Sequence, residues 1–492
     1  MPTLLPTSLL GDASAAFLSA LAELPLLAIL ITAPLAGALL IALLPRRHDT
    51  LVRSLSLLTH LLTLLIALLV LLAFVPGQSG FQFVRSTPWL PTLGSHLRVG
   101  VDALSVVFLP IVPLLFLGAV VDGWNTAATR HGSARLFHVL LLILLALTLA
   151  IFCALDSLFF FALWEASMLP LFFLIARFSS DPHARQSAMQ YVMLMLGSGG
   201  LLLFGFLLAG AMQGHFDLSA DSTLSPGQQK FIFVLILGGL AAKLPVVPLH
   251  TWLPRLALAG PAGLVATFGG LKLAAYALLR LSDSLTPEAA RELHWLLAGL
   301  GTVGILYGAL GAIAQSNLRT VLAYTGISHV GLVLLGIASF DHTGRQGALL
   351  VLLALPLTTG GLYLLAAFLQ RRTGTTDLHA LSGITHSAPR LTAIFLALAL
   401  ASVGLPGFAL FPGELMVFGS ALQVHTGAAL AALFGAGVGV AALLSAFRKV
   451  FHGPEGAHGP VPDLLPRELA LMLVFLTAAL SLGLLPGVVL AL

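Results

Sequence analysis

Charged residues are scarce in this chain of 492 residues, because aspartate, glutamate, lysine and arginine together make up only 9% of it. Cysteine is scarcer still. Cys153 is the single one, which excludes a disulfide within the chain and a metal or iron–sulfur centre held by several of its cysteines. The basic residues do not form the clusters that bind nucleic acid. The first 20 residues contain no lysine or arginine, so we predict no cleaved signal peptide.

The chain is rich in apolar residues instead, which form 58% of the sequence and give it a mean hydropathy of +1.03. Apolar runs of about 20 residues, the length that a helix needs to cross a lipid bilayer, recur from one end of the chain to the other. A transmembrane β-barrel would show shorter segments of alternating polarity. We therefore predict an all-α polytopic membrane protein that is surrounded by lipid and has no nucleic-acid partner.

Fourteen spans are predicted, and two of them should be broken in the middle. The twelfth is too long for one straight helix and contains Pro406 and Pro412, each followed by glycine, while the seventh contains Pro245 and Pro248. Proline inside a helix removes a hydrogen bond and kinks or breaks the helix. The predicted ranges are 24–44, 51–74, 101–121, 134–152, 155–177, 184–212, 228–250, 257–282, 294–314, 317–339, 346–370, 388–424, 427–451 and 465–491.

The basic residues predict how these spans are oriented. Of the 23 lysines and arginines, 15 fall in or beside connections that follow odd-numbered spans, six in or beside the other connections, and two deep inside spans. Cytoplasmic loops are enriched in lysine and arginine, so the odd-numbered connections should be cytoplasmic. Both termini should then lie on the opposite side of the membrane.

The second half of the chain repeats the order of features of the first half. Spans 4–8 contain a helix with Glu165 and then a broken helix with Lys243, whereas spans 9–13 contain a helix with His329 and then a broken helix with Glu414. An offset of five spans reverses the orientation, and inverted repeats with sites on broken helices are a known transporter design. We therefore predict two inverted five-helix repeats. The predicted divisions are 1–133 (spans 1–3), 134–283 (first repeat), 294–451 (second repeat) and 452–492 (span 14).

Four ionisable residues lie inside the long apolar runs: the lysines Lys243 and Lys272, and the glutamates Glu165 and Glu414. An ionisable group at bilayer depth costs at least about 2.5–3.5 kcal/mol on insertion scales, so such a group faces protein or water and marks a functional site. Two acids and two bases in this setting predict a route for protons or cations. A lysine binds and releases a proton when a carboxylate approaches and withdraws, and Glu165 is the natural partner of Lys243.

Each of the four residues also has a structural interpretation. Glu165 and Lys243 could form a static ion pair that only fixes the packing of two helices. Lys272 could extend its flexible side chain to the membrane surface. Glu414 could lie in a surface loop, depending on where span 12 breaks.

Several polar residues near these charges are further candidates. His329 follows Tyr324 and Ser328 in one span, and histidine relays protons because it titrates near neutrality. A lone histidine in an apolar helix is as often a hydrogen-bonded core residue. His250 ends span 7, where a position at the membrane interface is equally compatible. Asp156 begins span 5, where a carboxylate at the positive end of the helix dipole is the simpler interpretation.

Five stretches of the sequence carry a resemblance to one family. They are LDSLFFFALWEASMLPLFFLIA at 155–176, KLPVVPLHTWLP at 243–254, GLKLAAYALLR at 270–280, LAYTGISHVG at 322–331 and ASVGLPGFALFPGELMVFGS at 401–420. Over nearly its whole length the chain resembles the subunit M family of bacterial NADH:quinone oxidoreductase, respiratory complex I. This family belongs with the antiporter-like, proton-translocating membrane subunits that are related to multisubunit cation/proton antiporters.

The resemblance implies a role for each central residue and a setting for the protein. The matches are Glu165 and Lys243 to the acid–lysine pair, Lys272 to the central lysine, His329 to the connecting histidine and Glu414 to the terminal acid. It also implies a bacterial inner membrane with both termini on the periplasmic side. Neighbouring membrane-arm subunits, including other antiporter-like ones, would be the partners. No cofactor is expected in this chain, because NADH, flavin, iron–sulfur clusters and quinone belong to partner subunits.

The chain departs from the pattern of this family in several places, including residues 255–259 and the middle of span 11. After HTWLP, Arg255, Ala257 and Ala259 replace an aspartate, a histidine and a glutamate or glutamine. In span 11, a histidine common in the family is replaced near Pro356, with Thr358 close by. The central line is retained, so the route through the second repeat would depend more on water and hydroxyl groups.

Three functions remain open from the sequence. The first is a proton-translocating subunit of a complex I-type enzyme, coupled to quinone reduction elsewhere. The second is a cation/proton antiporter subunit of an Mrp-type or hydrogenase-type complex. The third is a structural subunit that has lost transport, which the missing polar residues would explain. The sequence contains no Walker A loop, zinc-binding spacing or serine triad, so we expect no redox or bond-breaking chemistry in the chain itself.

Overall fold

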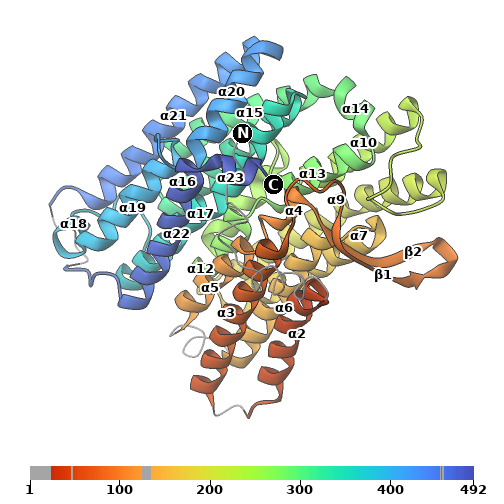
Figure 1. Ribbon diagram of the computed structural model, residues 1–492. Coiled ribbons are helices and arrows are strands. Elements are labelled where there is room, and N and C mark those ends of the chain that lie inside the picture. Colours follow the sequence, from red (N-terminus) through yellow and green to blue (C-terminus); the bar gives the residue numbers. More distant parts are fainter. Residues whose placement is uncertain (1–23, 46–47, 125–133, 455, 457–458) are drawn as a thin grey trace, which may run out of the picture.

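The computed structural model describes residues 24–45, 48–124, 134–454, 456 and 459–492. Residues 1–23, and with them the predicted side of the amino terminus, lie outside the described residues. So do Arg46, Arg47 and Arg130, three of the basic residues that predict the orientation. The described chain is a bundle of helices with one two-stranded β-hairpin at its edge (Figure 1).

The first half of the chain supplies the helices up to residue 284 and the hairpin. The helices are α2 (Leu26–Leu43), α3 (Asp49–Ala73), α4 (Ala103–Val106), α5 (Ile111–Gly123), α6 (Ala134–Cys153), α7 (Ser157–Ala166), α8 (Met168–Phe178), α9 (Ala184–Gln213), α10 (Pro226–Ala241), η2 (Leu249–Thr251), α11 (Trp252–Ala259), α12 (Ala262–Val265), the π-helical turn η3 (Ala266–Gly270) and α13 (Leu273–Ser284). The antiparallel hairpin consists of β1 (Gln82–Leu90), η1 (Pro91–Leu93) and β2 (Ser95–Val101).

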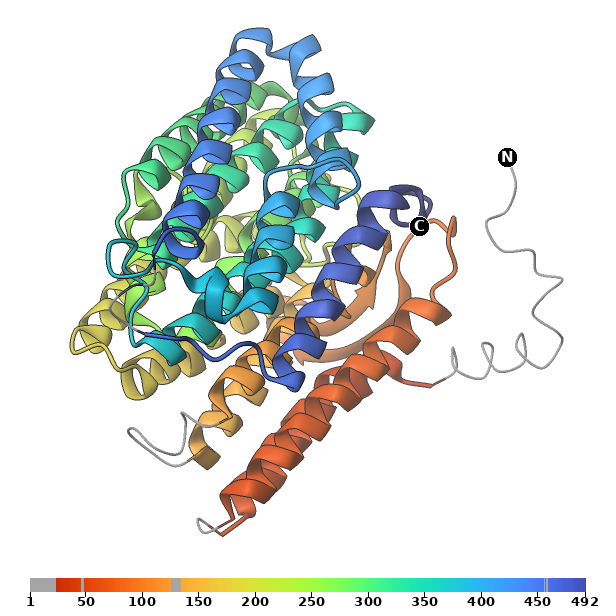
Figure 2. The same cartoon turned by 90° about the vertical axis from the view of Figure 1, so that its left-hand side faces the viewer.

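The second half of the chain supplies the remaining helices. They are α14 (Pro287–Glu292), α15 (His294–Ile313), α16 (Leu318–Ala338), α17 (His342–Thr373), α18 (Ile384–Ser387), α19 (Pro389–Ser402), α20 (Leu410–Val424), α21 (Thr426–Phe451), α22 (Pro466–Leu484) and α23 (Pro486–Leu490). The α2–α3 hairpin and the α20–α21 hairpin lie on opposite sides of the bundle in both views (Figures 1 and 2).

The predicted all-α membrane fold is confirmed. Within the described residues, twelve segments are helical, long and apolar enough to cross a membrane. The other two predicted spans are the ones that were expected to be broken. The break in span 7 separates α10 from α11, and the break in span 12 separates α19 from α20. The division into two inverted repeats stays a prediction.

Both predicted breaks place an ionisable residue beside backbone that is not helical. In span 7, α10 ends at Ala241, and Lys243 precedes Pro245 in the turn that follows. In span 12, residues 403–409 interrupt the helix, and Glu414 lies in the second half of the span, on α20. Proline at these positions removes backbone donors, which is the local reason that the helices stop.

Span 8, predicted over 257–282, is present as Ala262–Ser284, but it is not one continuous helix as expected. The helix is interrupted, because α12 runs into the π-helical turn η3 and Lys272 has φ −92° and ψ 59°, outside the helical region. Two glycines, Gly269 and Gly270, weaken the helix here. They also allow close packing: a methyl group on Gly270 would lie 2.8 Å from Cα of Gly360 in α17. A third broken span therefore carries the central lysine.

Helix α17 forms the centre of the bundle. It has 32 residues, is buried along most of its length, and contains Pro356 in its interior. It packs against α5, α12, η3, α16, α19, α20 and α22. The helix therefore contacts two of the broken spans, the one with Lys272 and the one with Glu414.

Candidate functional site

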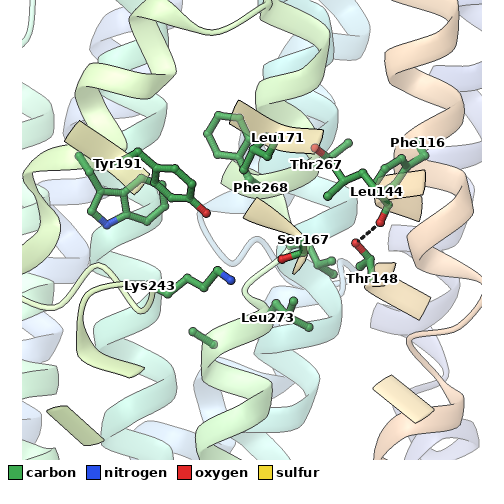
Figure 3. Close-up of a pocket in the computed structure, with 13 residues that line it drawn as sticks. Phe116, Leu144, Thr148, Ser167, Leu171, Tyr191, Lys243, Thr267, Phe268 and Leu273 are labelled. Carbon is green, nitrogen blue, oxygen red and sulfur yellow. Dashed lines mark hydrogen bonds between the residues drawn. The ribbon is translucent and has the colours of Figure 1, made fainter. Parts of the chain in front are cut away.

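Lys243 lies after the last turn of α10, and its side chain crosses to α7. Its Nζ lies 3.8 Å from the ring centroid of Trp164 and donates to the Trp164 carbonyl oxygen at 3.5 Å. A ring face at this distance attracts a charged ammonium. Figure 3 shows the side chain reaching into a cavity of about 70 Å³ that Thr148, Ser167 and Tyr191 also line. Lys243 thus meets polar groups and open space at depth in the bundle.

Glu165 lies on α7 directly after Trp164, within electrostatic reach of Lys243. Neither residue takes part in any of the ion pairs within 4.0 Å that the described residues form. Oε1 of Glu165 is buried and has no hydrogen-bond partner in the described part of the chain. The carboxylate faces Gly199 of α9, where a methyl group would overlap Oε1. The two charges are therefore held apart, which contradicts a static ion pair in this structure.

Lys272 is buried at the break of span 8, between η3 and α13. Its ammonium donates to the carbonyl oxygen of Gly269, one of the backbone groups freed by the break. On the other side it faces α16, where a methyl group on Gly326 would lie 2.9 Å from Nζ. The lysine does not extend to the surface of the bundle, so the interpretation as an interfacial lysine is wrong.

His329 and Glu414 continue the line on the other side of Lys272. His329 is buried on α16, one turn after Gly326, and its ring faces the backbone of Ser402 at the end of α19. Glu414 on α20 faces Gly404, where a side chain would overlap the carboxylate. Gly404 has φ +72°, a conformation that favours glycine, so the break in span 12 also makes room for the acid.

Two cavities each connect two members of this line, and a third cavity contains Lys243. The cavity of about 70 Å³ contains Lys243, and one of about 20 Å³ is lined by both Lys243 and Lys272 and reaches Val330, the neighbour of His329. A third cavity, of about 470 Å³, is lined by both His329 and Glu414. A water molecule needs about 10–15 Å³ by this kind of measure, so even the smallest cavity can hold one. Lys243 and Lys272 are therefore joined by space that water can occupy, and so are His329 and Glu414.

Of the secondary candidates, Ser328 lies beside this line, whereas His250 and Tyr324 contact each other and Tyr307. Ser328 lines the largest cavity and donates to the carbonyl oxygen of Ile305 at 3.3 Å. His250 is buried, with its ring centroid 4.7 Å from that of Tyr307 and 6.2 Å from that of Tyr324. The structure therefore buries His250 against two tyrosines, one of which, Tyr307, has 43% of its surface exposed.

The other two secondary candidates are engaged elsewhere. Asp156 caps α7, because its carboxylate accepts from the backbone N–H groups of Phe159 and His96, both at 2.9 Å. This geometry agrees with the structural interpretation of Asp156. Thr358 is buried in α17 and donates to the carbonyl oxygen of Ala354 at 3.0 Å, so its hydroxyl is satisfied within its own helix.

A second group of buried charges was missed in the sequence. We call it the arginine–carboxylate network, and it consists of Asp122, Arg371, Arg372 and Glu468. Arg371 lies 3.0 Å from Asp122 and 3.3 Å from Glu468, which also pairs with Arg372. Asp122 accepts from the backbone N–H of Gly263 at 3.0 Å, so the network joins α5, α17 and α22 to α12. The sequence did contain a signal for this network. The predicted spans place Asp122 and Glu468 at the same membrane surface as Arg371 and Arg372.

Comparison with known proteins finds similarity along nearly the whole chain. Residues 154–439 match the family described as NADH:quinone oxidoreductase/Mrp antiporter, TM. The chain is 32% identical over 489 residues to NAD(P)H-quinone oxidoreductase chain 4 of Prochlorococcus marinus, covering 95% of this chain and 90% of that one. It is 34% identical over 481 residues to NAD(P)H-quinone oxidoreductase chain 4 1 of Synechococcus elongatus, covering 94% and 89%.

Solved structures share the fold. A chain of respiratory complex I from Thermus thermophilus with bound NADH matches with a TM-score of 0.85 and 30% identity, covering 94% of this chain and 96% of that one. A chain of the Mrp complex from Dietzia sp. matches with a TM-score of 0.84 and 22% identity, covering 95% of each chain.

Proposed function

This chain belongs to the family of NADH:quinone oxidoreductase and Mrp antiporter transmembrane subunits, and on that premise we propose that it moves protons through a membrane. The path follows the line of ionisable groups inside the bundle. Its members are Glu165, Lys243, Lys272, His329 and Glu414. One observation supports this proposal most directly: cavities link Lys243 to Lys272 and His329 to Glu414. In addition, none of these groups takes part in an ion pair of the described residues.

The steps of the path follow from the chemistry of each group. A carboxylate near a lysine favours the protonated lysine, so movement of Glu165 toward or away from Lys243 makes the lysine bind or release a proton. The proton passes to Lys272 through water in the cavity that both lysines line. It continues to His329, whose imidazole ring can accept a proton at one nitrogen and donate one from the other. From His329 it reaches Glu414 across the largest cavity.

The relatives support a redox-linked complex as the setting. Relatives at 32% and 34% identity are named as chains of NAD(P)H-quinone oxidoreductase, and the matching chain at 30% identity comes from a respiratory complex I. In our proposal this chain is a membrane-arm subunit in a bacterial inner membrane, with both termini periplasmic and the two halves arranged as inverted repeats. Quinone reduction in partner subunits, which hold NADH, flavin and iron–sulfur clusters, drives the transport.

A cation/proton antiporter subunit is the second candidate, because the chain also shares its fold with a chain of an Mrp complex. That match is 22% identical and concerns the fold alone. Proton transport that needs added Na⁺ or K⁺ and no electron donor would favour this second function. Transport that starts on addition of NADH, without a Na⁺ or K⁺ requirement, would favour the first.

The sharpest test is Lys243→Ala in the assembled complex reconstituted into lipid vesicles. We expect the initial rate of NADH-driven proton pumping to fall at least about tenfold, since a group that transfers protons typically contributes about 10²–10⁴-fold. The fall should be measured with a pH-sensitive dye, at equal content of assembled complex. Glu165→Ala should have the same effect, because it removes the partner of the lysine.

Lys230→Ala is the matched control. Lys230 lies on the same helix α10 but is exposed, where it pairs with Glu292. The control should pump like the wild type. Wild-type pumping by Lys243→Ala, with intact assembly, would refute the proposed path.

A further inference from the structure

The largest cavity extends from Glu414 toward one end of the bundle. Its lining along α20 runs from Glu414 to Leu422, which is about 12 Å of helix at 1.5 Å per residue. Its lining along α21 runs from Val440 back to Leu433, so both helices of the α20–α21 hairpin enclose it. His425 joins these two helices, one turn beyond Leu422. The cavity therefore leads from the terminal acid toward a histidine at the end of the hairpin.

His425 is paired with a second histidine. Its Nε2 lies 2.8 Å from Nδ1 of His294, the first residue of α15, and the two ring centroids are 4.7 Å apart. The backbone carbonyl of Ala338, at the end of α16, lies close enough to the His425 ring to act as its hydrogen-bond acceptor. The ends of α15, α16, α20 and α21, four helices that line the cavity, thus meet at this pair.

The carbonyl group of Ala338 sets the direction of the hydrogen bonds in the histidine pair. A carbonyl oxygen can only accept, so the His425 nitrogen that faces Ala338 carries the hydrogen, and Nε2 of the neutral ring is an acceptor. Nδ1–H of His294 then donates to His425, which leaves Nε2 of His294 with its lone pair. A proton that binds there creates an imidazolium, and its hydrogen bond to His425 becomes charge-assisted and stronger. The pair is therefore arranged to accept one proton.

This end of the bundle lies at a membrane–water interface. Trp295, the neighbour of His294, has 60% of its surface exposed, and tryptophan is enriched where the bilayer meets water. Both histidines of the pair are partly exposed, in contrast to the buried His329. A proton on the pair can therefore pass directly to bulk water.

We propose that His294 and His425 form the release site of the second half of the chain, taking protons from the cavity beside Glu414 and passing them to the aqueous phase. This role rests on the proton-translocating function proposed above. Only a proton is transferred: it leaves a water molecule in the cavity, binds Nε2 of His294, and moves to bulk water. Burial, and then the neighbouring His294, lower the pKa of His425, which favours the neutral ring that accepts from His294.

Other ionisable groups at this end belong to the elements that flank the pair. They are Arg291 and Glu292 at the end of α14, and Asp341 and His342 at the start of α17. Glu292 pairs with Lys230, and Asp341 accepts from Ser420, so both carboxylates have their own partners. His342 is exposed, so its substitution is a suitable control for the histidine pair.

The test uses vesicles that contain the complete complex, with NADH added outside and the pH of the lumen varied between about 5.5 and 7.5, around the ordinary pKa of histidine. In the wild type, the initial pumping rate should fall as the lumen is acidified, because the release site is then already protonated. His294→Gln and His425→Gln keep hydrogen-bonding groups but cannot carry a proton. Each variant should lower the pumping rate about tenfold at neutral pH. This loss is smaller than the contribution of a catalytic acid or base, because water partly replaces the missing imidazole. Each variant should also flatten the dependence of the rate on lumenal pH.

His342→Gln is the control, and it should keep both the rate and the pH dependence of the wild type. Pair variants that also keep both would overturn the release site. A wild type whose rate does not depend on lumenal pH would overturn it without any variant. Lys243→Ala, measured in parallel, separates the two proposals. If it abolishes pumping while the pair variants pump normally, the release site fails and the proton path stands. If it pumps normally, the path itself fails.

Discussion

Two sets of buried charges in this bundle are held in opposite ways. In the arginine–carboxylate network, each carboxylate contacts a guanidinium group, with Arg371 3.0 Å from Asp122 and 3.3 Å from Glu468. Along the line from Glu165 to Glu414, no member forms any of the ion pairs found in the described residues. The two sets lie on different helices, and α17, which carries Arg371 and Arg372, packs against η3, α16 and α20 of the line.

The difference separates charges that hold the fold from charges that are free to change their protonation. Removing one member of a buried ion pair leaves its partner uncompensated, so a paired network favours a single arrangement. The carboxylate or ammonium groups of the line instead face glycines (Gly199, Gly326 and Gly404) and cavities. This environment leaves room for water and for small movements of the charged groups. A group that must gain and lose a proton needs such freedom.

The largest effect on stability is expected from Glu468→Ala, which breaks the network at its centre. Glu468 is fully buried, pairs with two arginines, and accepts from the backbone N–H of Leu465 at 3.0 Å. Its removal leaves buried guanidinium charge without its partner, and we expect a loss of about 3–5 kcal/mol. The measurements are the amount of assembled protein in membranes and its thermal unfolding in detergent.

Glu292→Ala is the control for this change. Glu292 pairs with Lys230 at the surface, where both side chains are about half exposed. Such pairs contribute about 0–1 kcal/mol, so the control should assemble and unfold like the wild type. If Glu468→Ala were as mild as Glu292→Ala, the network would not hold the helix ends together.

Gly326→Ala should affect function more than stability. The added methyl group would lie 2.9 Å from Nζ of Lys272 and would push the ammonium away from α16. The end of a lysine side chain moves easily, so we expect no loss of assembly. Pumping should fall about tenfold, which equals about 1.4 kcal/mol in the barrier to proton transfer. The initial pumping rate at equal content of assembled complex checks this.

Gly299→Ala on α15 is the matched control, because a methyl group there would meet nothing within 4 Å. Alanine is the better helix former by about 1 kcal/mol, so this variant should be at least as stable as the wild type and should pump normally. Equal pumping by both glycine variants would show that the space around Lys272 is not needed for transport.

The sequence was sufficient to predict most of the fold. Apolar runs of span length located the membrane helices, and Pro245, Pro248 and Pro406 located the breaks in spans 7 and 12, because a missing backbone donor acts locally. Four ionisable residues inside apolar runs identified the line from Glu165 to Glu414, because burying a charge in the membrane costs much free energy wherever it lies. These signals depend on residues close together in the chain.

What the sequence did not predict depends on contacts between distant residues. The break at Lys272 follows from the close packing of Gly270 on Gly360, and nothing in the local sequence distinguishes it from a helix with two glycines. The network needs Asp122 and Glu468 to meet across three helices. The hairpin of β1 and β2 lies in a connection whose residues carry no apolar span signal.

The smallest effect is expected from Asp122→Asn, which tests whether the two sets of charges act separately. The amide oxygen can still accept from the backbone N–H of Gly263 at the start of α12, and Arg371 keeps Glu468 as a partner. We expect a loss of about 1–2 kcal/mol from the missing charge–charge hydrogen bond, less than for Glu468→Ala. Thermal unfolding should report this loss, while pumping per assembled complex should equal that of the wild type. Since α12 leads through η3 to Lys272, a variant that assembles normally but pumps poorly would contradict the separation. It would show that the network positions the lysine as well as the helix ends.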